Sequence, residues 1–162
     1  MDSIFSNLYC CEFECPITVA GTEHMLTFHS AEAAYHSMKA KRLDDAYLLT
    51  ARMNGFAART TGKALIMATE FGARRISKWV DYRLTAMRIV LSYKWCVLAF
   101  ALFLVKCNGV IYEDISSRDN PFAGAQGFLR HFYDNLRSCL RERLRLGLTI
   151  DQPWLNTVRD RI

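Results

Sequence analysis

The sequence has few residues that interrupt regular structure, and it has no long apolar run. It contains only three Pro and eight Gly in 162 residues. No stretch has the composition of a flexible linker or of a disordered segment. The longest apolar run, Trp95 to Val105, covers about half of the roughly 20 residues that a membrane-crossing helix needs. We therefore expect one domain over residues 1–162, with this run in a buried helix and no membrane partner.

Several motifs that identify enzyme classes are also missing. The chain has neither of the Gly-rich phosphate loops, G-x-x-x-x-G-K-[ST] or G-x-G-x-x-G. It has no G-x-S-x-G elbow and no H-E-x-x-H zinc motif. The four His are scattered along the chain, so we expect no metal centre and no cofactor-binding motif of these classes.

The six Cys form no C-x-x-C pair, which argues against a zinc site at Cys10, Cys11 and Cys15. The opening residues, Met1-Asp2-Ser3, lack the charged start and apolar run of a secretory signal. We therefore expect free thiols in a reducing compartment and a cytoplasmic location.

The net charge is +5, and Arg is the main basic residue of the second half. Two interpretations stay open. The arginines form a solvated helix face, or they attract an anionic partner such as a nucleotide or nucleic acid. They are Arg130, Arg137, Arg141, Arg143, Arg145, Arg159 and Arg161.

Local signals predict an α+β protein that is mainly helical and has one small β-hairpin. The strands are expected over residues 16–19 and 24–28. Helices are expected over residues 30–43, 44–52, 56–61, 78–106 and 128–146, with a short tail helix from Pro153, a strand over 110–115 and a loop over 116–127. Ser30 and Ser77 are the expected N-caps, Asn54-Gly55 the expected end of the second helix, and Gly62 the expected break after residue 61.

The strongest functional candidate is the segment from Ser30 to Lys39. On a 3.6-residue repeat, Glu32, Tyr35 and Lys39 fall along one stripe, with His36 beside them. An acid, a phenol and an amine among small apolar residues suit the handling of a charged, partly aromatic small molecule. The alternative is a surface helix on which Glu32 matches the helix dipole and pairs with Lys39.

Two other places hold candidate residues. Trp79, at an expected helix start, is either a hydrophobic staple or a platform on which a base stacks. Asp119 and Phe122 lie in a segment of turn residues, which is either a plain turn or a functional loop.

Taken in order, these pieces resemble the motifs of the YbiA-like (NADAR) family. The order is F-S-N, S-x-E-x-x-Y-x-x-x-K, G-[RK], W-x3-R-x3-M-x3-L-x2-K-[FW], then E-x5-D with an aromatic residue three further on. The resemblance covers about residues 4 to 145. The matching residues are Phe5-Ser6-Asn7, Ser30, Glu32, Tyr35, Lys39, Gly62-Lys63, Trp79, Arg83, Met87, Leu91, Lys94, Trp95, Glu113, Asp119 and Phe122.

The resemblance implies a YbiA-like fold and an N-glycosidase that hydrolyses a ribose C–N bond without a cofactor. Members act on ADP-ribose compounds, including ADP-ribose attached to guanine in DNA, or on phosphorylated riboflavin-pathway intermediates. By position the catalytic residues are Glu32, Lys39 and Asp119. The substrate-binding residues are Asn7, Tyr35, Lys63, Trp79, Arg83, Arg118 and Phe122.

The chemistry of C–N cleavage suggests roles for these residues. Glu32 or Asp119 stabilises the oxocarbenium-like state or activates a water. Lys39 either holds a phosphate or forms a Schiff base with the sugar. Arg83, Lys63 and Arg118 are candidates for the pyrophosphate.

The sequence departs from the family pattern at three places. Ala33 stands where the family commonly has His, Phe122-Ala123 where it has Trp-Gly, and Asp134-Asn135-Leu136-Arg137 where it has N-x-L-G. Two other hypotheses therefore stay open. One is a non-catalytic module that binds ADP-ribose-like ligands, and the other is a protein-interaction protein that uses its basic last helix.

Overall fold

The chain divides into two compact units, Met1–Lys94 and Trp95–Ile162. The computed structural model describes residues 4–68, 73–109, 111 and 127–162, and it leaves out the side chains of residues 66–68 and 73–81. Each unit has its own buried apolar core.

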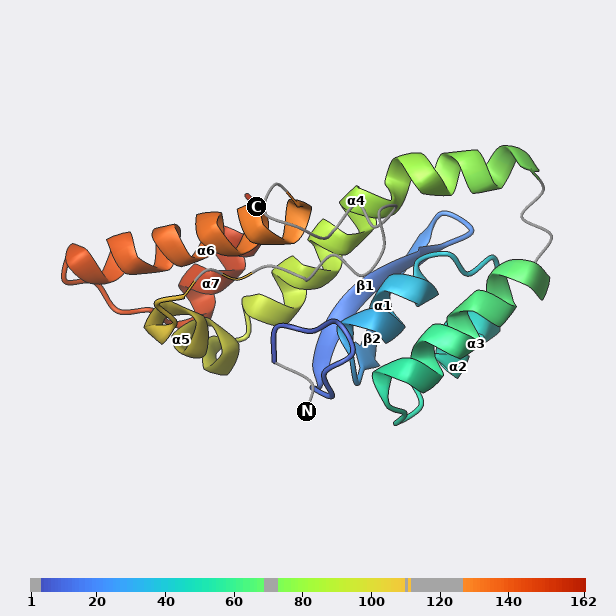
Figure 1. Ribbon diagram of the computed structural model, residues 1–162, viewed down its shortest axis with the longest axis horizontal. Coiled ribbons are helices and arrows are strands. Elements are labelled where there is room, and N and C mark those ends of the chain that lie inside the picture. The colour runs from blue at the N-terminus through green and yellow to red at the C-terminus, as the bar shows by residue number, and fades with distance from the viewer. Residues whose placement is uncertain (1–3, 69–72, 110, 112–126) are drawn as a thin grey trace. The chain divides into compact units, whose positions relative to one another are not determined.

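The first unit begins with a turn and a β-hairpin (Figure 1). Strand β1 (Phe13–Val19) pairs antiparallel with β2 (Thr22–Phe28). The turn consists of Ala20 and Gly21, with φ values of 51° and 84°. Positive φ at both positions matches the right-handed twist of the strands. The predicted hairpin is confirmed, and its turn is shorter than expected because Thr22 and Glu23 already pair with β1.

Helix α1 (Ala31–Ser37) starts where predicted but ends early. The Ser30 hydroxyl accepts a hydrogen bond from the Ala33 amide at 3.1 Å, which confirms the N-cap. The predicted extension to residue 43 is wrong. The Lys39 amide donates to the His36 carbonyl at 3.2 Å, so the backbone tightens into a turn before α2 (Leu43–Leu48).

Helix α3 (Gly55–Ala68) corrects two predictions. Asn54 does not end a helix, because its side-chain oxygen accepts from the Ala57 amide at 2.9 Å and caps the start of α3. Gly62 does not break the helix. A Cβ at Gly55 would overlap the backbone of Leu8, and a Cβ at Gly62 would overlap the ring of His36. Both glycines therefore mark close packing, and at Gly62 α3 lies against α1 (Figure 1).

Helix α4 (Ala73–Trp95) begins before Ser77, so the prediction of Ser77 as an N-cap is wrong. Near its end, Lys94 is fully buried. The Lys94 ammonium donates to the carbonyls of Ile4 at 3.0 Å and Ser6 at 3.3 Å. This contact holds the N-terminal turn against α4.

The second unit contains α5 (Leu98–Lys106), α6 (Phe128–Arg145) and α7 (Gln152–Arg159). The single helix predicted over 78–106 is wrong, because it is interrupted at Cys96 and Val97. The Gln152 amide satisfies the polar groups at this break. Its nitrogen donates to the Cys96 carbonyl at 2.8 Å, and its oxygen accepts from the Leu98 amide at 3.0 Å.

The predicted helices α6 and α7 are confirmed. Gly147, with φ of 72°, follows the end of α6. Asp151 caps α7 by accepting from the Trp154 amide at 2.9 Å, and Pro153 lies in its first turn. Trp95 and Tyr133 pack edge to face in the core of this unit, with ring centroids 5.3 Å apart.

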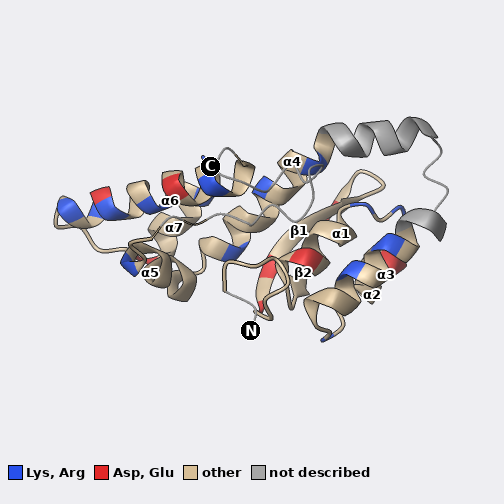
Figure 2. Cartoon of the chain, viewed as in Figure 1, with Lys and Arg blue, Asp and Glu red and all other residues tan. Residues whose placement is uncertain are grey.

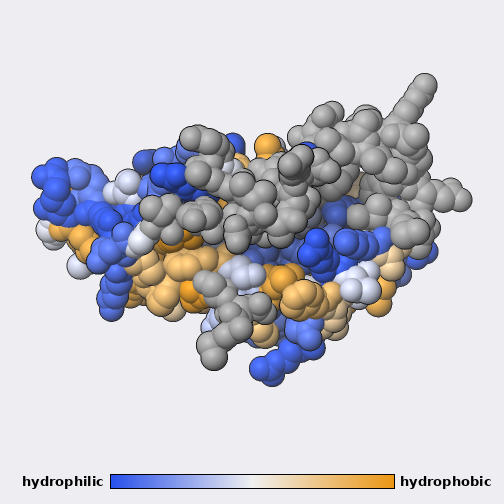
Figure 3. All heavy atoms as spheres, viewed as in Figure 1, coloured by the Kyte–Doolittle hydropathy of each residue, from blue (hydrophilic) through white to orange (hydrophobic). Residues whose placement is uncertain are grey.

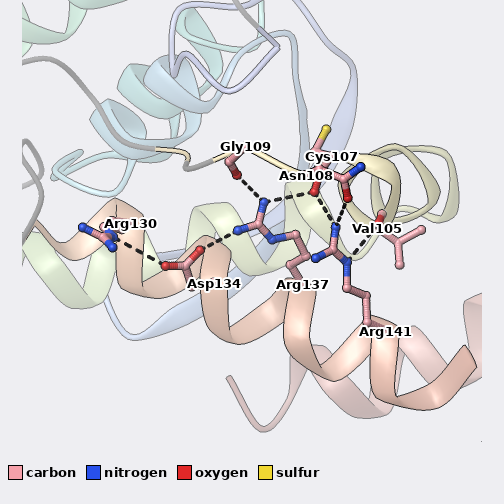
Figure 4. A network of polar contacts seen from close by, with 8 residues as sticks. All are labelled: Val105, Cys107, Asn108, Gly109, Arg130, Asp134, Arg137 and Arg141. Carbon is pink, nitrogen blue, oxygen red and sulfur yellow. Dashed lines mark hydrogen bonds and ion pairs between the residues drawn. The ribbon is translucent and has the colours of Figure 1, made fainter. Parts of the chain in front are cut away.

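Two arginines of α6 hold the end of α5 (Figure 4). Arg137 donates to the carbonyls of Cys107 at 3.1 Å and Gly109 at 2.6 Å. Arg141 donates to the carbonyls of Val105 at 3.2 Å and Cys107 at 2.6 Å. The last carbonyls of a helix lack an intrahelical partner, so the two side chains act as a C-terminal cap. Neither interpretation offered by the sequence covers this use of the basic helix.

Helix α5 is apolar around most of its circumference, and Leu102 and Phe103 are exposed. Apolar residues gather over α5 in Figure 3. Among the described helices none is long and apolar enough by itself to cross a membrane. Helices α4 and α5 reach that length and composition only when they are counted together.

The fold class is therefore as predicted: an α+β chain, mainly helical, with one small hairpin. The predicted strand over 110–115 and most of the loop over 116–127 lie outside the described residues. The single domain and the YbiA-like fold stay predictions.

Candidate active site on helix α1

Three side chains, two on α1 and one in the turn that follows it, form a continuous chain of polar contacts. His36 Nε2 lies 3.0 Å from Glu32 Oε1. His36 Nδ1 lies 2.9 Å from Lys39 Nζ. Glu32 and His36 are one helical turn apart, and the tight turn after Ser37 brings Lys39 back onto the ring. Glu32 and Lys39 are thus joined through His36, whereas the sequence suggested a direct ion pair.

These contacts define the protonation of the ring. An ammonium group has only donors, so Nδ1 accepts from Lys39. The ring proton of neutral His36 is then on Nε2, where it donates to the Glu32 carboxylate. The cluster therefore consists of the Lys39 ammonium, the neutral His36 imidazole and the Glu32 carboxylate, linked in that order.

The cluster is largely removed from water. Lys39 is 8% exposed, and the side chains of His36 and Glu32 are 5% and 13% exposed. Burial lowers the pKa of Lys39 to about 8, although the Glu32 carboxylate opposes this change and the Lys63 charge adds to it. Burial also lowers the pKa of His36, against the hydrogen bond to Glu32. The Tyr35 ring lies 5.0 Å from Lys39 Nζ and supports its charge.

Helix α3 brings two further cations to this cluster. Arg59 Nε lies 3.9 Å from Glu32 Oε1, and its side chain is 52% exposed. Lys63, one turn further along α3, is exposed. Figure 2 shows basic residues along α3. Positive charge that suits an anionic ligand therefore lies next to Lys39.

Asn7 approaches the cluster from the N-terminal turn. Its backbone carbonyl accepts from the Glu32 amide at 2.9 Å. Its side-chain oxygen is buried and has no hydrogen-bond partner among the residues that the structure describes. A buried acceptor of this kind is uncommon in native proteins. It marks the start of α1 as a place where a donor from a ligand would fit.

The structure brings Asn7, Glu32, Tyr35, Lys39 and Lys63 to one region of the first unit. Arg83 lies on α4, on neither α1 nor α3. Trp79 lies inside α4 and not at its start, so the helix-start placement is wrong; its side chain is outside the described part. Arg118, Asp119 and Phe122 lie outside the described residues.

Sequence reasoning did not select His36, Arg59 or Lys94 for the site. His36 had a signal, because it stands four residues after Glu32. Arg59 had none, because its contact depends on how α3 packs against α1. Lys94 was matched only as part of a motif, and its burial against the N-terminal turn depends on residues about 90 positions apart.

In the described part of the chain, no three His, Cys, Asp or Glu side chains gather as a metal site would require. No protein-family model and no curated protein matches the chain. The resemblance to the YbiA-like family therefore stays a prediction, and the proposed function depends on the cluster itself.

Proposed function

We propose that the protein is an N-glycosidase that hydrolyses a ribose C–N bond. The observation that carries this proposal is the buried amine of Lys39, whose pKa of about 8 lies near neutrality, in series with the Glu32 carboxylate. An amine that is partly neutral at pH 7 to 8 is suited to attack a sugar carbon. A nearby carboxylate is suited to stabilise the cation that forms when the bond breaks.

The proposed substrate is ADP-ribose attached to guanine in nucleic acid, or a related ribosyl phosphate such as a riboflavin-pathway intermediate. The exposed cations Arg59 and Lys63 support an anionic substrate. Asn7 and Tyr35 are proposed to contact it from the same region. Trp79, Arg83, Arg118, Asp119 and Phe122 keep the roles that the resemblance implies, as proposals.

The proposed reaction begins with attack of neutral Lys39 on C1 of the ribose. The C1–N bond breaks, its electron pair stays with the base nitrogen, and that nitrogen takes a proton from the attacking amine. The ring then opens as a second amine proton moves to the ring oxygen, which leaves C1 in a Schiff base. Water releases the sugar as an aldehyde, which closes again, and restores the amine. Glu32 or Asp119 stabilises the charge at C1.

Glu32→Gln tests this proposal directly. The change removes the carboxylate but keeps the size of the side chain, so we expect release of ADP-ribose from an ADP-ribosylated guanine oligonucleotide to fall by at least about 100-fold. Mass spectrometry of the released sugar measures the rate. Glu23→Gln, on the exposed side of β2, is the matched control and should keep full activity. Full activity of Glu32→Gln would remove Glu32 from the reaction.

Borohydride trapping tests the role of Lys39. Reduction during turnover should add the mass of the sugar compound to the peptide that carries Lys39, and Lys39→Arg should not be labelled. The panel should include phosphorylated riboflavin precursors alongside ADP-ribosylated oligonucleotides. Tight binding without release from any of them would replace the glycosidase by the ligand-binding module.

A further inference from the structure

His36 uses both ring nitrogens inside the cluster, and the reaction proposed above does not assign it a task. We propose that His36 moves the proton between Lys39 and Glu32, so that the three side chains form an amine–imidazole–carboxylate relay. This inference rests on the proposed function, in which Lys39 is the reacting amine. It adds a proton-transfer residue that the sequence analysis did not select.

The proton movements balance within the cluster. Lys39 gives one proton to Nδ1 of His36, and His36 gives its Nε2 proton to the Glu32 carboxylate. The result is a neutral amine, a neutral imidazole with its proton on Nδ1, and a carboxylic acid. One positive and one negative charge disappear together. Low exposure of all three groups favours this, because buried charges lose solvation. The same path in reverse returns the proton to the Lys39 amine after water has released the sugar.

The packing around His36 holds its ring in the orientation that the relay needs. Gly62 of α3 lies against the ring, where a side chain would overlap it. The Tyr35 ring contacts it edge to face, with centroids 5.4 Å apart. A ring held on two sides keeps Nδ1 toward Lys39 and Nε2 toward Glu32, as the third member of a catalytic triad holds its histidine.

The charges that face the ring predict how the relay depends on pH. Glu32 faces it from α1, Lys39 from the turn after α1, and Arg59 from α3; Lys63 acts on Lys39 from α3. A protonated His36 has two donors and no acceptor, so it cannot take the Lys39 proton. The rate at which Lys39 reacts should therefore fall as the pH drops through the pKa of His36, which burial places below 6.5.

The test measures the reactivity of Lys39 without any ribosyl substrate. Formaldehyde with cyanoborohydride methylates amines through an iminium, and peptide mass spectrometry gives the rate at Lys39 relative to the exposed Lys63. In His36→Gln we expect this ratio to fall by about 100-fold, the low end of general acid–base effects. In His36→Ala the ratio should fall likewise and recover with added imidazole. It should not recover with pyrrole, which has the same shape and no basic nitrogen.

The outcomes separate the relay from the proposed function. An unchanged Lys39 to Lys63 ratio in His36→Gln, or equal rescue by pyrrole, overturns the relay and leaves the glycosidase proposal standing. A ratio that depends on His36 in a protein that cleaves no ribosyl substrate supports the relay and overturns the glycosidase. The long-range ¹H–¹⁵N spectrum of the wild-type protein gives an independent check that needs no variant. A proton on Nδ1 of His36 at pH 7 would also overturn the relay.

Discussion

Burial of the Lys39 amine has two effects: it costs folding free energy, and it lowers the pKa of the amine. Its ammonium is removed from water, and the His36 nitrogen, the Tyr35 face and the field of Glu32 compensate in part for the missing solvation. Burial therefore lowers the pKa of Lys39, and the same burial makes its neutral form accessible near pH 8.

Because burial lowers the pKa of Lys39, we expect the free energy of unfolding to depend on the protonation of this side chain. Its pKa is about 8 in the folded chain, against 10.5 in an unfolded chain. Between these values the unfolded state binds more protons, so the free energy of unfolding should rise with pH across this window. We expect wild type to gain about 3 kcal/mol relative to Lys39→Met between pH 8 and 10.5. Urea unfolding at several pH values measures the difference.

The comparison with Lys39→Met removes the other groups that titrate in this range. Burial raises the pKa of Cys11, Cys15 and Cys96, which works in the opposite direction but equally in both proteins. A constant difference between wild type and Lys39→Met across the window would mean that Lys39 has an ordinary pKa.

At the scale of elements, α3 is placed by its two glycines. Gly55 lies against the Leu8 backbone and Gly62 against the His36 ring. They are seven residues apart and so share one face of the helix. This face allows the close approach to α1 that brings Arg59 toward Glu32.

Gly62→Ala should therefore destabilise the protein, although the same change in an open helix stabilises by about 1 kcal/mol. The added methyl group would overlap the ring, and overpacking of this kind costs about 1–3 kcal/mol. Thermal unfolding measures the change. Gly109→Ala is the matched control, because a Cβ there meets open space. If Gly62→Ala stabilises the protein, the close packing against the ring is absent.

The cap of α5 by α6 predicts which arginines matter for stability. Arg137 is 12% exposed and donates to two carbonyls and to Asp134, whereas Arg145 is 70% exposed and pairs with Glu142. We expect Arg137→Gln to lower the free energy of unfolding by about 2 kcal/mol, whereas Arg145→Gln should leave it almost unchanged because water screens an exposed ion pair. Equal decreases in denaturant unfolding would contradict the cap. Loss of function on charge reversal at Arg137 would then not by itself indicate a protein partner.

The comparison of α1, α3 and α4 shows what local sequence signals can predict. The Ser30 cap, the hairpin, α6 and the Pro153 helix depend on neighbours within a few residues, and they were predicted. The continuation of α3 through Gly62 was missed, because this glycine is needed for close packing against His36 on another helix. The break at Cys96 was missed because Gln152, far along the chain, supplies its hydrogen bonds.

In the candidate site, too, local features could be predicted from the sequence and contacts between distant segments could not. The stripe of Glu32, Tyr35 and Lys39 was visible as a helical repeat. The central position of His36 was not, because it depends on the turn after Ser37 that returns Lys39 to the ring. The use of the α6 arginines was missed for the same reason, since their partners are carbonyls of α5.

Across the whole chain, a net charge of +5 overstates the positive charge that is available to a partner. Arg137 and Arg141 are bound to backbone carbonyls, and Arg145 pairs with Glu142. On α3, by contrast, Arg59 and Lys63 are exposed beside the candidate site.

Salt dependence of binding can separate these two groups of cations. With an ADP-ribosylated single strand, removing a side chain that binds one phosphate should reduce the slope of log affinity against log salt by about 0.7. We expect this reduction for Arg59→Gln and for Lys63→Gln. Arg141→Gln should leave the slope unchanged. Fluorescence anisotropy at several salt concentrations measures the slopes, and the reverse pattern would place the nucleic acid on α6.

The buried ammonium of Lys94 also provides a built-in reporter of local opening. It is enclosed by the turn whose carbonyls it binds, so a water-borne acylating reagent reaches it only when that turn lifts away from α4. The acylation rate of this one amine in otherwise native protein therefore measures how often the turn that carries Asn7 opens. A ligand bound at the start of α1 should lower that rate.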